Sequence, residues 1–220
     1  MRQMRRVRQQ LTQEECIRVL ERGTHGVLAV LGDEGYPYAV PLSYVHGDGK
    51  LWFHCAKTGH KLDALRAYPK VSFCVVDRDE IVPEEYTTYF RSVIAFGTAR
   101  ELEDPWEKRQ ALEALAAKYY MRRGYLLLNH NYRTRMGELD LVLYKDGQLI
   151  FAEVKTRAGR MLDAPAAAVD ARKQRRLILA AQQYLQHSPY RDAAIRFDVV
   201  EVTPAARGWQ VHCIPDAFQC

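Results

Sequence analysis

The sequence has no long apolar run, no internal repeat and no Gly/Ser linker. No window approaches the roughly 18 apolar residues that a membrane helix needs, and the basic residues 1–8 lack the apolar core of a signal peptide. We therefore expect a soluble, cytoplasmic protein without a membrane partner. Paired cysteines are lacking too. The five cysteines are odd in number and widely spaced, with no CxxC motif, which argues against a disulfide framework and against a cysteine zinc site.

Positive charge is in small excess, and this excess is unevenly distributed along the chain. The net charge is +5. Residues 1–110 contain 16 Lys/Arg and 16 Asp/Glu, whereas residues 111–220 contain 16 Lys/Arg and 11 Asp/Glu, so the whole excess lies in the second half. Such an excess suits a polyanionic partner. Apolar residues make up 48% of the 220, which is enough for a buried core.

The first half is predicted to be a helix followed by a small β-barrel. Thr12 and Glu15 form a capping box at the start of the helix, and Gly23 ends it. Short β-like runs separated by turn residues then predict five strands and one further helix. The strands are expected at 26–31, 38–45, 50–55, 70–76 and 92–101, and the helix at about 60–67. Many short strands with a single helix between them favour a barrel.

The pattern changes after Asp104-Pro105. Residues 106–123 predict a helix rich in Ala and Leu, and Asp170 is a suitable N-cap for another helix at 171–187. Strands are expected at 139–144, 149–156, 195–202 and 209–214. We therefore predict an α+β chain of two parts, residues 1–110 and 111–220. The helix that spans the boundary would itself be the joint.

The strongest motif lies on two of these strands. If Asp146-Gly147 forms a two-residue hairpin turn, Asp140 faces Glu153, and Glu138 faces Lys155. Because side chains alternate along a strand, all four would lie on one face of the ribbon. The opposite face would be core, with the apolar residues Leu139, Leu141, Leu143, Ile150, Ala152 and Val154.

Two opposed carboxylates predict a cation between them. Their Cβ atoms would be roughly 5 Å apart, which is unfavourable without a positive charge. Mg²⁺ or Mn²⁺ suits this position, because both prefer carboxylate oxygens, and a neighbouring lysine helps to position or deprotonate an attacking water. This is the equipment for metal-assisted phosphodiester hydrolysis. The alternative is an exposed hairpin face with ordinary charges and one Glu–Lys pair.

The second half also resembles the YraN family, which belongs to the PD-(D/E)xK nuclease-like superfamily with its α/β restriction-endonuclease-like fold. The matching segments include Asn131-Tyr132-Arg133, Gly137-Glu138-Leu139-Asp140-Leu141, Glu153-Val154-Lys155-Thr156-Arg157, Ala168-Val169-Asp170 with Lys173, and Arg196-Phe197-Asp198-Val199-Val200. The resemblance implies Glu138, Asp140, Glu153 and Lys155 as the catalytic set. Within it, Asp140 and Glu153 are the expected metal ligands.

Basic residues surround this motif. The expected helix at 171–187 carries Arg172, Lys173, Arg175 and Arg176, and Arg133, Arg135 and Arg157 flank the carboxylates. These residues are candidates for contacts with the phosphate backbone of DNA, which give affinity without reading sequence. A solvated helix face is the alternative.

Four segments of residues 13–110 form a further pattern: Pro37-Tyr38-Ala39-Val40-Pro41-Leu42, Leu51-Trp52-Phe53-His54-Cys55-Ala56, Pro69-Lys70-Val71-Ser72-Phe73 and Ser92-Val93-Ile94-Ala95-Phe96-Gly97. With these segments, residues 13–110 resemble the pyridoxamine 5′-phosphate oxidase-like split barrels, and among them the nitroimidazole-resistance subgroup. The resemblance implies FMN, with Ser43 and His54 near the flavin ring. Thr58, His60 and Lys61 stand at a helix start, which attracts a phosphate. Packed or surface histidines are the alternative for His54 and His60.

The split-barrel family continues with one more barrel strand where this chain enters its second half. We therefore expect a fusion in which the barrel lacks its last strand and exposes an unpaired edge. The flavin site of these folds lies at a dimer interface, so a homodimer through the barrel would accompany FMN, and a monomer would bind FMN weakly.

Three functions follow from these features. The first is a metal-dependent nuclease that acts on DNA, branched DNA included. The second is an FMN-dependent oxidoreductase or flavin carrier, and the third is nucleic-acid binding without catalysis. A flavin absorption band would favour the second, and metal-dependent cleavage would separate the first from the third.

Overall fold

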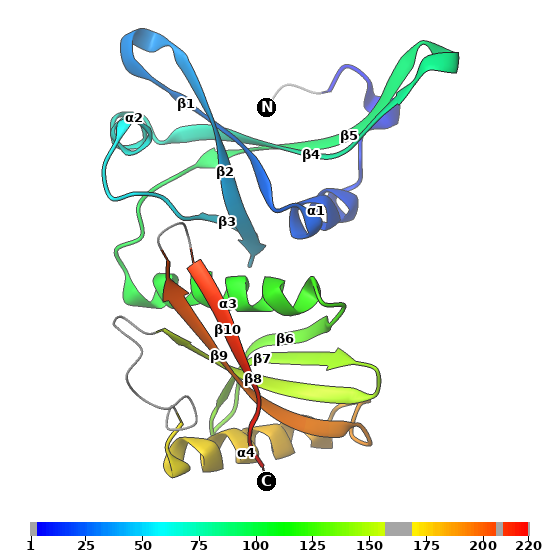
Figure 1. Ribbon diagram of the computed structural model, residues 1–220, viewed down its shortest axis with the longest axis vertical. Coiled ribbons are helices and arrows are strands. Elements are labelled where there is room, and N and C mark those ends of the chain that lie inside the picture. Colours follow the sequence, from blue (N-terminus) through cyan, green and yellow to red (C-terminus); the bar gives the residue numbers. More distant parts are fainter. Residues whose placement is uncertain (1–3, 157–168, 206–208, 220) are drawn as a thin grey trace. The chain divides into compact units, whose positions relative to one another are not determined.

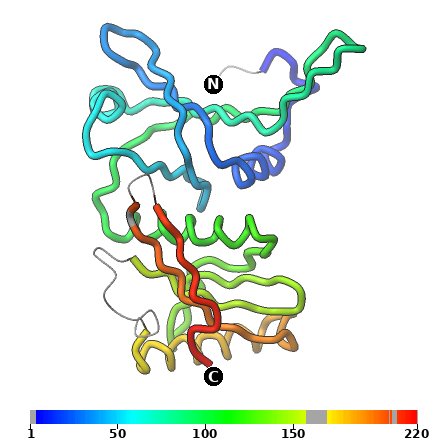
Figure 2. The backbone as a smooth tube through the Cα atoms, viewed as in Figure 1, coloured from blue at the N-terminus to red at the C-terminus, as the bar shows by residue number. Residues whose placement is uncertain are grey.

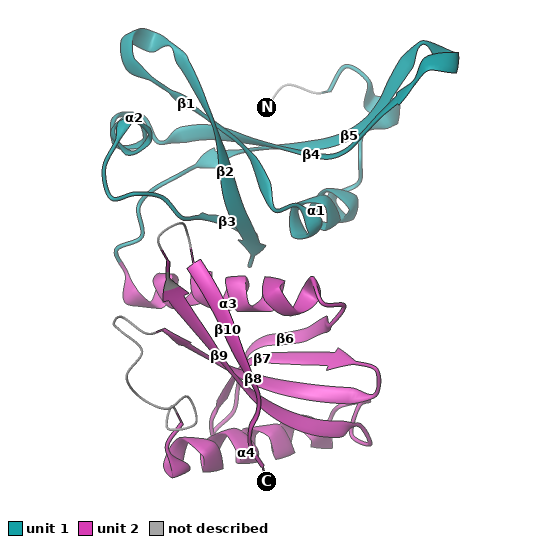
Figure 3. Ribbon diagram, in the orientation of Figure 1, with its two compact units in different colours: residues 1–103 teal, residues 104–220 magenta. Residues whose placement is uncertain are grey.

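The computed structural model describes residues 4–156, 169–205 and 209–219. The chain forms two compact units, residues 1–103 and 104–220 (Figure 3). The division precedes helix α3 (Pro105–Met121), so the whole of this helix belongs to the second unit, whereas the sequence placed the boundary near residue 110. No described helix is long and apolar enough to cross a membrane.

The first unit contains an open antiparallel sheet with the strand order β3-β2-β1-β4-β5 (Figure 1). Strands β3 and β5 lie at its edges, in agreement with a barrel that does not close. The strands are β1 (His25–Leu31), β2 (Pro37–Gly47), β3 (Lys50–Phe53), β4 (Lys70–Val82) and β5 (Thr87–Thr98). The helices are α1 (Gln13–Arg22), α2 (His60–Ala67) and the short 3-10 turns η1 (Val7–Gln9), η2 (Asp33–Gly35) and η3 (Pro83–Glu85).

Helix α1 begins with the predicted capping box. The Glu15 backbone N–H donates to Thr12 Oγ1 (3.2 Å), and the Thr12 backbone N–H donates to Glu15 Oε2 (2.8 Å). Val19 and Leu20 then pack the helix against Phe73 and other apolar residues of the sheet. The pairing of β4 and β5 extends farther than expected, beyond a bulge after Val76. The sequence does not predict this extension because the run 77–80 is entirely charged and the extension lacks an apolar alternation.

The second unit contains a five-stranded sheet with α3 (Pro105–Met121) packed on one face and α4 (Ala171–Gln186) on the other (Figures 1 and 2). Its strand order is β10-β9-β8-β7-β6, in which only β8 and β9 are parallel neighbours among the described strands. The elements are β6 (Leu126–Arg133), β7 (Glu138–Lys145), β8 (Gln148–Thr156), α4 (Ala171–Gln186), β9 (Ala194–Pro204) and β10 (Trp209–Phe218). Asp170 caps α4 as predicted, by accepting from the Lys173 backbone N–H. Strand β6 was not predicted, because its polar run 129–131 hides the alternation.

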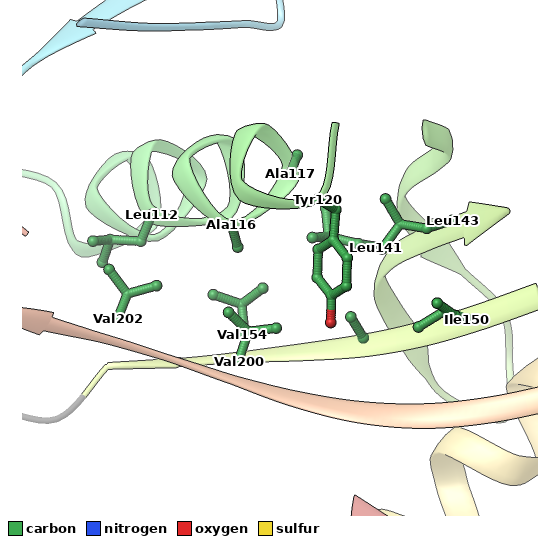
Figure 4. Packing of buried hydrophobic residues seen from close by; sticks show 11 residues of the cluster. Leu112, Ala116, Ala117, Tyr120, Leu141, Leu143, Ile150, Val154, Val200 and Val202 are labelled. Carbon is green, nitrogen blue, oxygen red and sulfur yellow. The ribbon is translucent and has the colours of Figure 1, made fainter. Parts of the chain in front are cut away.

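Both faces of this sheet are buried, which corrects the expectation of one core face. On the α3 side, Ala116 and Tyr120 pack with Leu141 (Figure 4). On the α4 side, Leu177 and Ala181 pack with Leu139, Val142, Phe151 and others. Leu139 was expected to lie beside Leu141 but belongs to the α4 cluster. The cause of the two cores is that each helix covers one face of the central strands.

The turn between β6 and β7 lies against α4 at Gly137. A Cβ on Gly137 would lie 2.7 Å from the carbonyl oxygen of Arg176. Backbone atoms of a helix cannot retreat cheaply, so only glycine fits here.

We expect Gly137→Ala to lower the free energy of unfolding by about 1–3 kcal/mol, the usual cost of overpacking. Urea denaturation followed by circular dichroism measures this change. Gly97→Ala is the control, because a Cβ there would meet nothing within 4 Å. Equal effects of the two substitutions would contradict the close approach as the cause.

Candidate functional site

The predicted hairpin of β7 and β8 is present with the predicted register. Its pairs run from Leu141↔Ala152 to Lys145↔Gln148. The turn has positive φ at both central residues, Asp146 (48°) and Gly147 (81°), as a type I′ turn requires. The expected pairs Asp140–Glu153 and Glu138–Lys155 are not part of this ladder, which ends at Leu141↔Ala152. Asp140 and Glu153 lie just beyond that last pair.

Asp140 is fully buried, with 0% of its surface exposed. Its Oδ1 accepts from Nη2 of Arg109 in α3 (2.6 Å), and its Oδ2 accepts from the backbone N–H of Val154 in β8 (2.8 Å). Burial, and then the negative charge of Glu153, raise the pKa of the Asp140 carboxyl well above its usual range. Arg109 lowers this pKa but does not cancel the rise. The two carboxylates therefore influence each other electrostatically, and Arg109 is the counter-ion of Asp140.

Glu153 is also buried, with 6% of its surface exposed. Its Oε1 lies 3.1 Å from Nζ of Lys173 in α4, and its Oε2 is buried without a hydrogen-bond partner. A buried carboxylate oxygen without a partner is costly. A divalent cation fits the pair, because Mg²⁺ usually takes one or two carboxylates and completes its shell with water and substrate phosphate. The described residues contain no cluster of three or more His, Cys, Asp or Glu side chains arranged around a metal position.

Glu113 on α3 is a buried carboxylate that the sequence did not indicate. It is 0% exposed, and Arg109 donates to its Oε1 (2.7 Å). His130 Nε2 (3.1 Å) and Asn131 Nδ2 (2.9 Å) contact its Oε2. Burial alone raises the pKa of Glu113, but the hydrogen bonds outweigh it and the pKa lies below its usual value. Arg109 thus joins Glu113 to Asp140. The sequence signal for Glu113 was its spacing, a Glu four residues after an Arg within an otherwise Ala- and Leu-rich helix.

The remaining members of the expected catalytic set have other neighbours. Glu138 forms an ion pair with Arg133 of β6 (3.4 Å). Lys155 is half-buried, two residues after Glu153, and is aligned with Glu201 of β9. One common open face was expected for all four side chains. This expectation is not met, because the counter-ion of Asp140 comes from α3 and that of Glu153 from α4, the helices on opposite faces of the sheet.

The basic residues form part of the surface near this site. Arg133, Arg135, Arg172, Arg175 and Arg176 are exposed, whereas Lys173 is engaged with Glu153. The packing of Gly137 against Arg176 brings the turn that carries Arg135 next to α4. Arg157 lies outside the described residues.

In the first unit, the expected phosphate site is the start of α2. Gly59 precedes the helix with φ of 126°, no side chain caps the helix, and Lys61 lies in the first turn. The His60 ring stacks on Tyr38, with centroids 4.3 Å apart, and its Nε2 lies 3.6 Å from Asp33 Oδ2. An uncapped helix start beside basic side chains fits an anion. The other candidates for the flavin are exposed: Ser43, His54 and Thr58.

Two family models match the chain. The model described as uncharacterised protein family UPF0102 matches residues 112–202, and the model described as pyridoxamine 5′-phosphate oxidase matches residues 12–145. The matches overlap at 112–145, which includes most of α3 together with β6 and β7. UPF0102 corresponds to the YraN resemblance.

Relatives and solved structures match each half. A UPF0102 protein of Symbiobacterium thermophilum is 44% identical over 111 residues, which are 50% of this chain and 93% of that protein. A UPF0102 protein of Methylococcus capsulatus is 40% identical over 107 residues, 49% of this chain and 86% of that protein.

Among solved structures, an FAD-binding protein of Mesorhizobium loti is 29% identical, with 52% of this chain and 78% of that chain covered and a TM-score of 0.39. An FAD and heme binding protein of Mycobacterium smegmatis is 24% identical, with 52% and 57% covered and a TM-score of 0.44. A solved structure described as a 5-nitroimidazole antibiotic resistance protein of Bacteroides thetaiotaomicron is 22% identical, with 49% of this chain and 66% of that chain covered and a TM-score of 0.44. The pyridoxamine 5′-phosphate oxidase model matches more than half of the chain, and the UPF0102 proteins above are matched over 86% and 93% of their own length. The chain therefore belongs to both the pyridoxamine 5′-phosphate oxidase family and the UPF0102 family.

Proposed function

We propose that the second unit is a metal-dependent endonuclease domain that hydrolyses phosphodiester bonds of DNA. One observation carries the proposal: two buried carboxylates, Asp140 and Glu153, lie on neighbouring strands just beyond their last paired residues, and Glu153 Oε2 has no hydrogen-bond partner. Membership of UPF0102, the family that the sequence links to PD-(D/E)xK nucleases, supports the same reading. Branched DNA is part of the proposal, because of that superfamily resemblance.

Asp140 and Glu153 would hold Mg²⁺ or Mn²⁺, which supplies charge neutralisation at the scissile phosphate. Lys155 follows Glu153 by two residues, and its ammonium would orient the attacking water. Arg109 keeps Asp140 in place through a 2.6 Å ion pair. Glu138 is held by Arg133 and would act at the margin of the site.

The carboxylates provide the direct test. Asp140→Asn or Glu153→Gln keeps the side-chain shape but removes a metal-binding charge. We expect cleavage to fall by about 10³-fold or more, which corresponds to several kcal/mol of lost transition-state stabilisation. DNA binding should be unchanged or tighter, because repulsion between carboxylate and phosphate is relieved. Cleavage of linear and branched DNA with and without Mg²⁺, and a parallel binding titration, measure both effects.

Asp146→Asn is the matched control, because the same change then falls on the exposed hairpin turn. It should cleave like the parent. If the Asp140 and Glu153 variants also cleave like the parent, the activity belongs to another site or to a contaminant. If the parent binds DNA but never cleaves it, nucleic-acid binding without catalysis is the function.

The basic surface predicts a different phenotype. Changing Arg172, Arg175 and Arg176 together to Ala should weaken binding alike for every DNA sequence. The slope of log K against log salt should fall by roughly 0.9 for each DNA phosphate that the variant no longer neutralises. Fluorescence anisotropy over a salt series measures this. Replacing Arg5, Arg6 and Arg8 instead removes the same charge elsewhere, and an equal decrease of slope there would refute a local DNA interface.

We propose, as a second function, that the first unit binds FMN for oxidoreductase chemistry. Its support is the family membership together with the uncapped start of α2 beside Lys61. A homodimer through this unit belongs to the proposal. Exposed apolar side chains on neighbouring strands, Val76, Ile94 and Phe96, form a patch that suits such an interface.

Flavin titration tests this second function. We expect weak FMN binding by the monomer, and a several-fold loss of FMN affinity on Lys61→Gln, because the phosphate loses a positive neighbour. Riboflavin, which has no phosphate, should bind both proteins equally. Quenching of flavin fluorescence, with light scattering for the oligomeric state, measures these quantities. Lys57→Gln is the control, and tight stoichiometric FMN binding by a monomer would contradict the expectation.

A further inference from the structure

Lys173 at the start of α4 contacts the buried carboxylate Glu153. Lys173 Nζ lies 3.1 Å from Glu153 Oε1, and 34% of the lysine side chain is exposed against 7% for the glutamate. Asp170 accepts from the Lys173 backbone N–H (2.7 Å), so the N-cap fixes where on the first turn the lysine stands. The ammonium therefore extends from a defined position at the helix start to a buried oxygen.

We propose that Lys173 is a positioning residue that occupies the metal's place as counter-ion of Glu153 and leaves it when Mg²⁺ or Mn²⁺ binds. This inference rests on the proposed metal site. Without a metal, two nearby buried carboxylates require compensating charge inside the protein. Arg109 provides it for Asp140, and Lys173 provides it for Glu153.

The two cations differ in how firmly they are held. Arg109 bonds both Asp140 and Glu113 with its planar guanidinium, at 2.6 Å and 2.7 Å. Lys173 approaches Glu153 from the partly exposed start of α4, as a point charge on a flexible stem. An arriving cation would therefore displace Lys173 and leave Arg109 in place. Glu153 then offers both oxygens to the metal, the free Oε2 and the vacated Oε1.

Displacement would also link the metal to DNA. The released ammonium shares the first turns of α4 with the exposed Arg172, Arg175 and Arg176, so it would join the surface proposed to contact phosphate. Two ligands that favour the same position of one side chain bind cooperatively, and the coupling is reciprocal. A backbone phosphate and the metal would therefore each strengthen the binding of the other through Lys173.

Mn²⁺ binding to the full chain without DNA is the test, with free Mn²⁺ measured by electron paramagnetic resonance. An opposite charge close to a carboxylate changes its affinity for a proton by one to three powers of ten, so we expect Lys173→Gln to bind Mn²⁺ roughly tenfold more tightly. Lys173→Arg should bind like the parent, because it retains the competing charge. Arg172→Gln carries the same charge change on the adjacent exposed residue, and it should shift the affinity far less.

Equal affinities for Lys173→Gln and Arg172→Gln would overturn the inference, as would weaker Mn²⁺ binding by Lys173→Gln or undetectable Mn²⁺ binding by every variant. Thermal unfolding of each variant separates these results from loss of structure. If Lys173→Gln does not fold, Lys173→Met, which keeps the apolar stem, replaces it. Suppose that Lys173→Gln binds Mn²⁺ more tightly than the parent but neither protein cleaves DNA. This result would refute the nuclease and leave the role of Lys173 standing.

Discussion

Helices on both faces of a sheet shield the middle of its central strands from solvent, so each charged side chain buried there must be neutralised inside the protein. Burial of an uncompensated charge costs more than a domain of this size can spare. This constraint governs the second unit. Asp140, Glu153 and Asp198 lie on β7, β8 and β9, and each is buried. Their partners come from α3, from α4 and from β9 itself, so the helices supply charge as well as apolar cover.

Two neighbouring strands of the sheet, β8 and β9, satisfy this constraint differently. Asp198 accepts two hydrogen bonds from Arg196 (2.8 and 2.9 Å), one from the Tyr120 hydroxyl (2.8 Å) and one from the Asp216 backbone N–H (3.1 Å). Such a saturated carboxylate stabilises the fold and has no free position for a ligand. Glu153 keeps one buried oxygen without a partner. This contrast favours Glu153 over Asp198 as part of a candidate site.

Local features of this protein could be read from the sequence, whereas the cover of the sheet could not. The Asp146-Gly147 turn fixes the register of β7 and β8, and Thr12 and Asp170 define helix starts, because each acts within a few residues. The burial of Asp140 depends on α3 and that of Glu153 on α4, which meet the strands only in the folded chain. Glu113 was missed for the same reason, since a Glu four residues after an Arg is also common on exposed helix faces and does not reveal burial.

Helix α3 belongs entirely to the second unit, yet the pyridoxamine 5′-phosphate oxidase match continues through it to residue 145. Division of the chain before the helix would thus leave the UPF0102 match whole and cut the other match short. The two halves are not equivalent as movable modules. The C-terminal half includes α3, which forms part of its own core, so it keeps this helix in any fusion. The N-terminal half would need the sequence up to residue 145 to complete its family match, and α3 in that stretch already belongs to the core of the second unit.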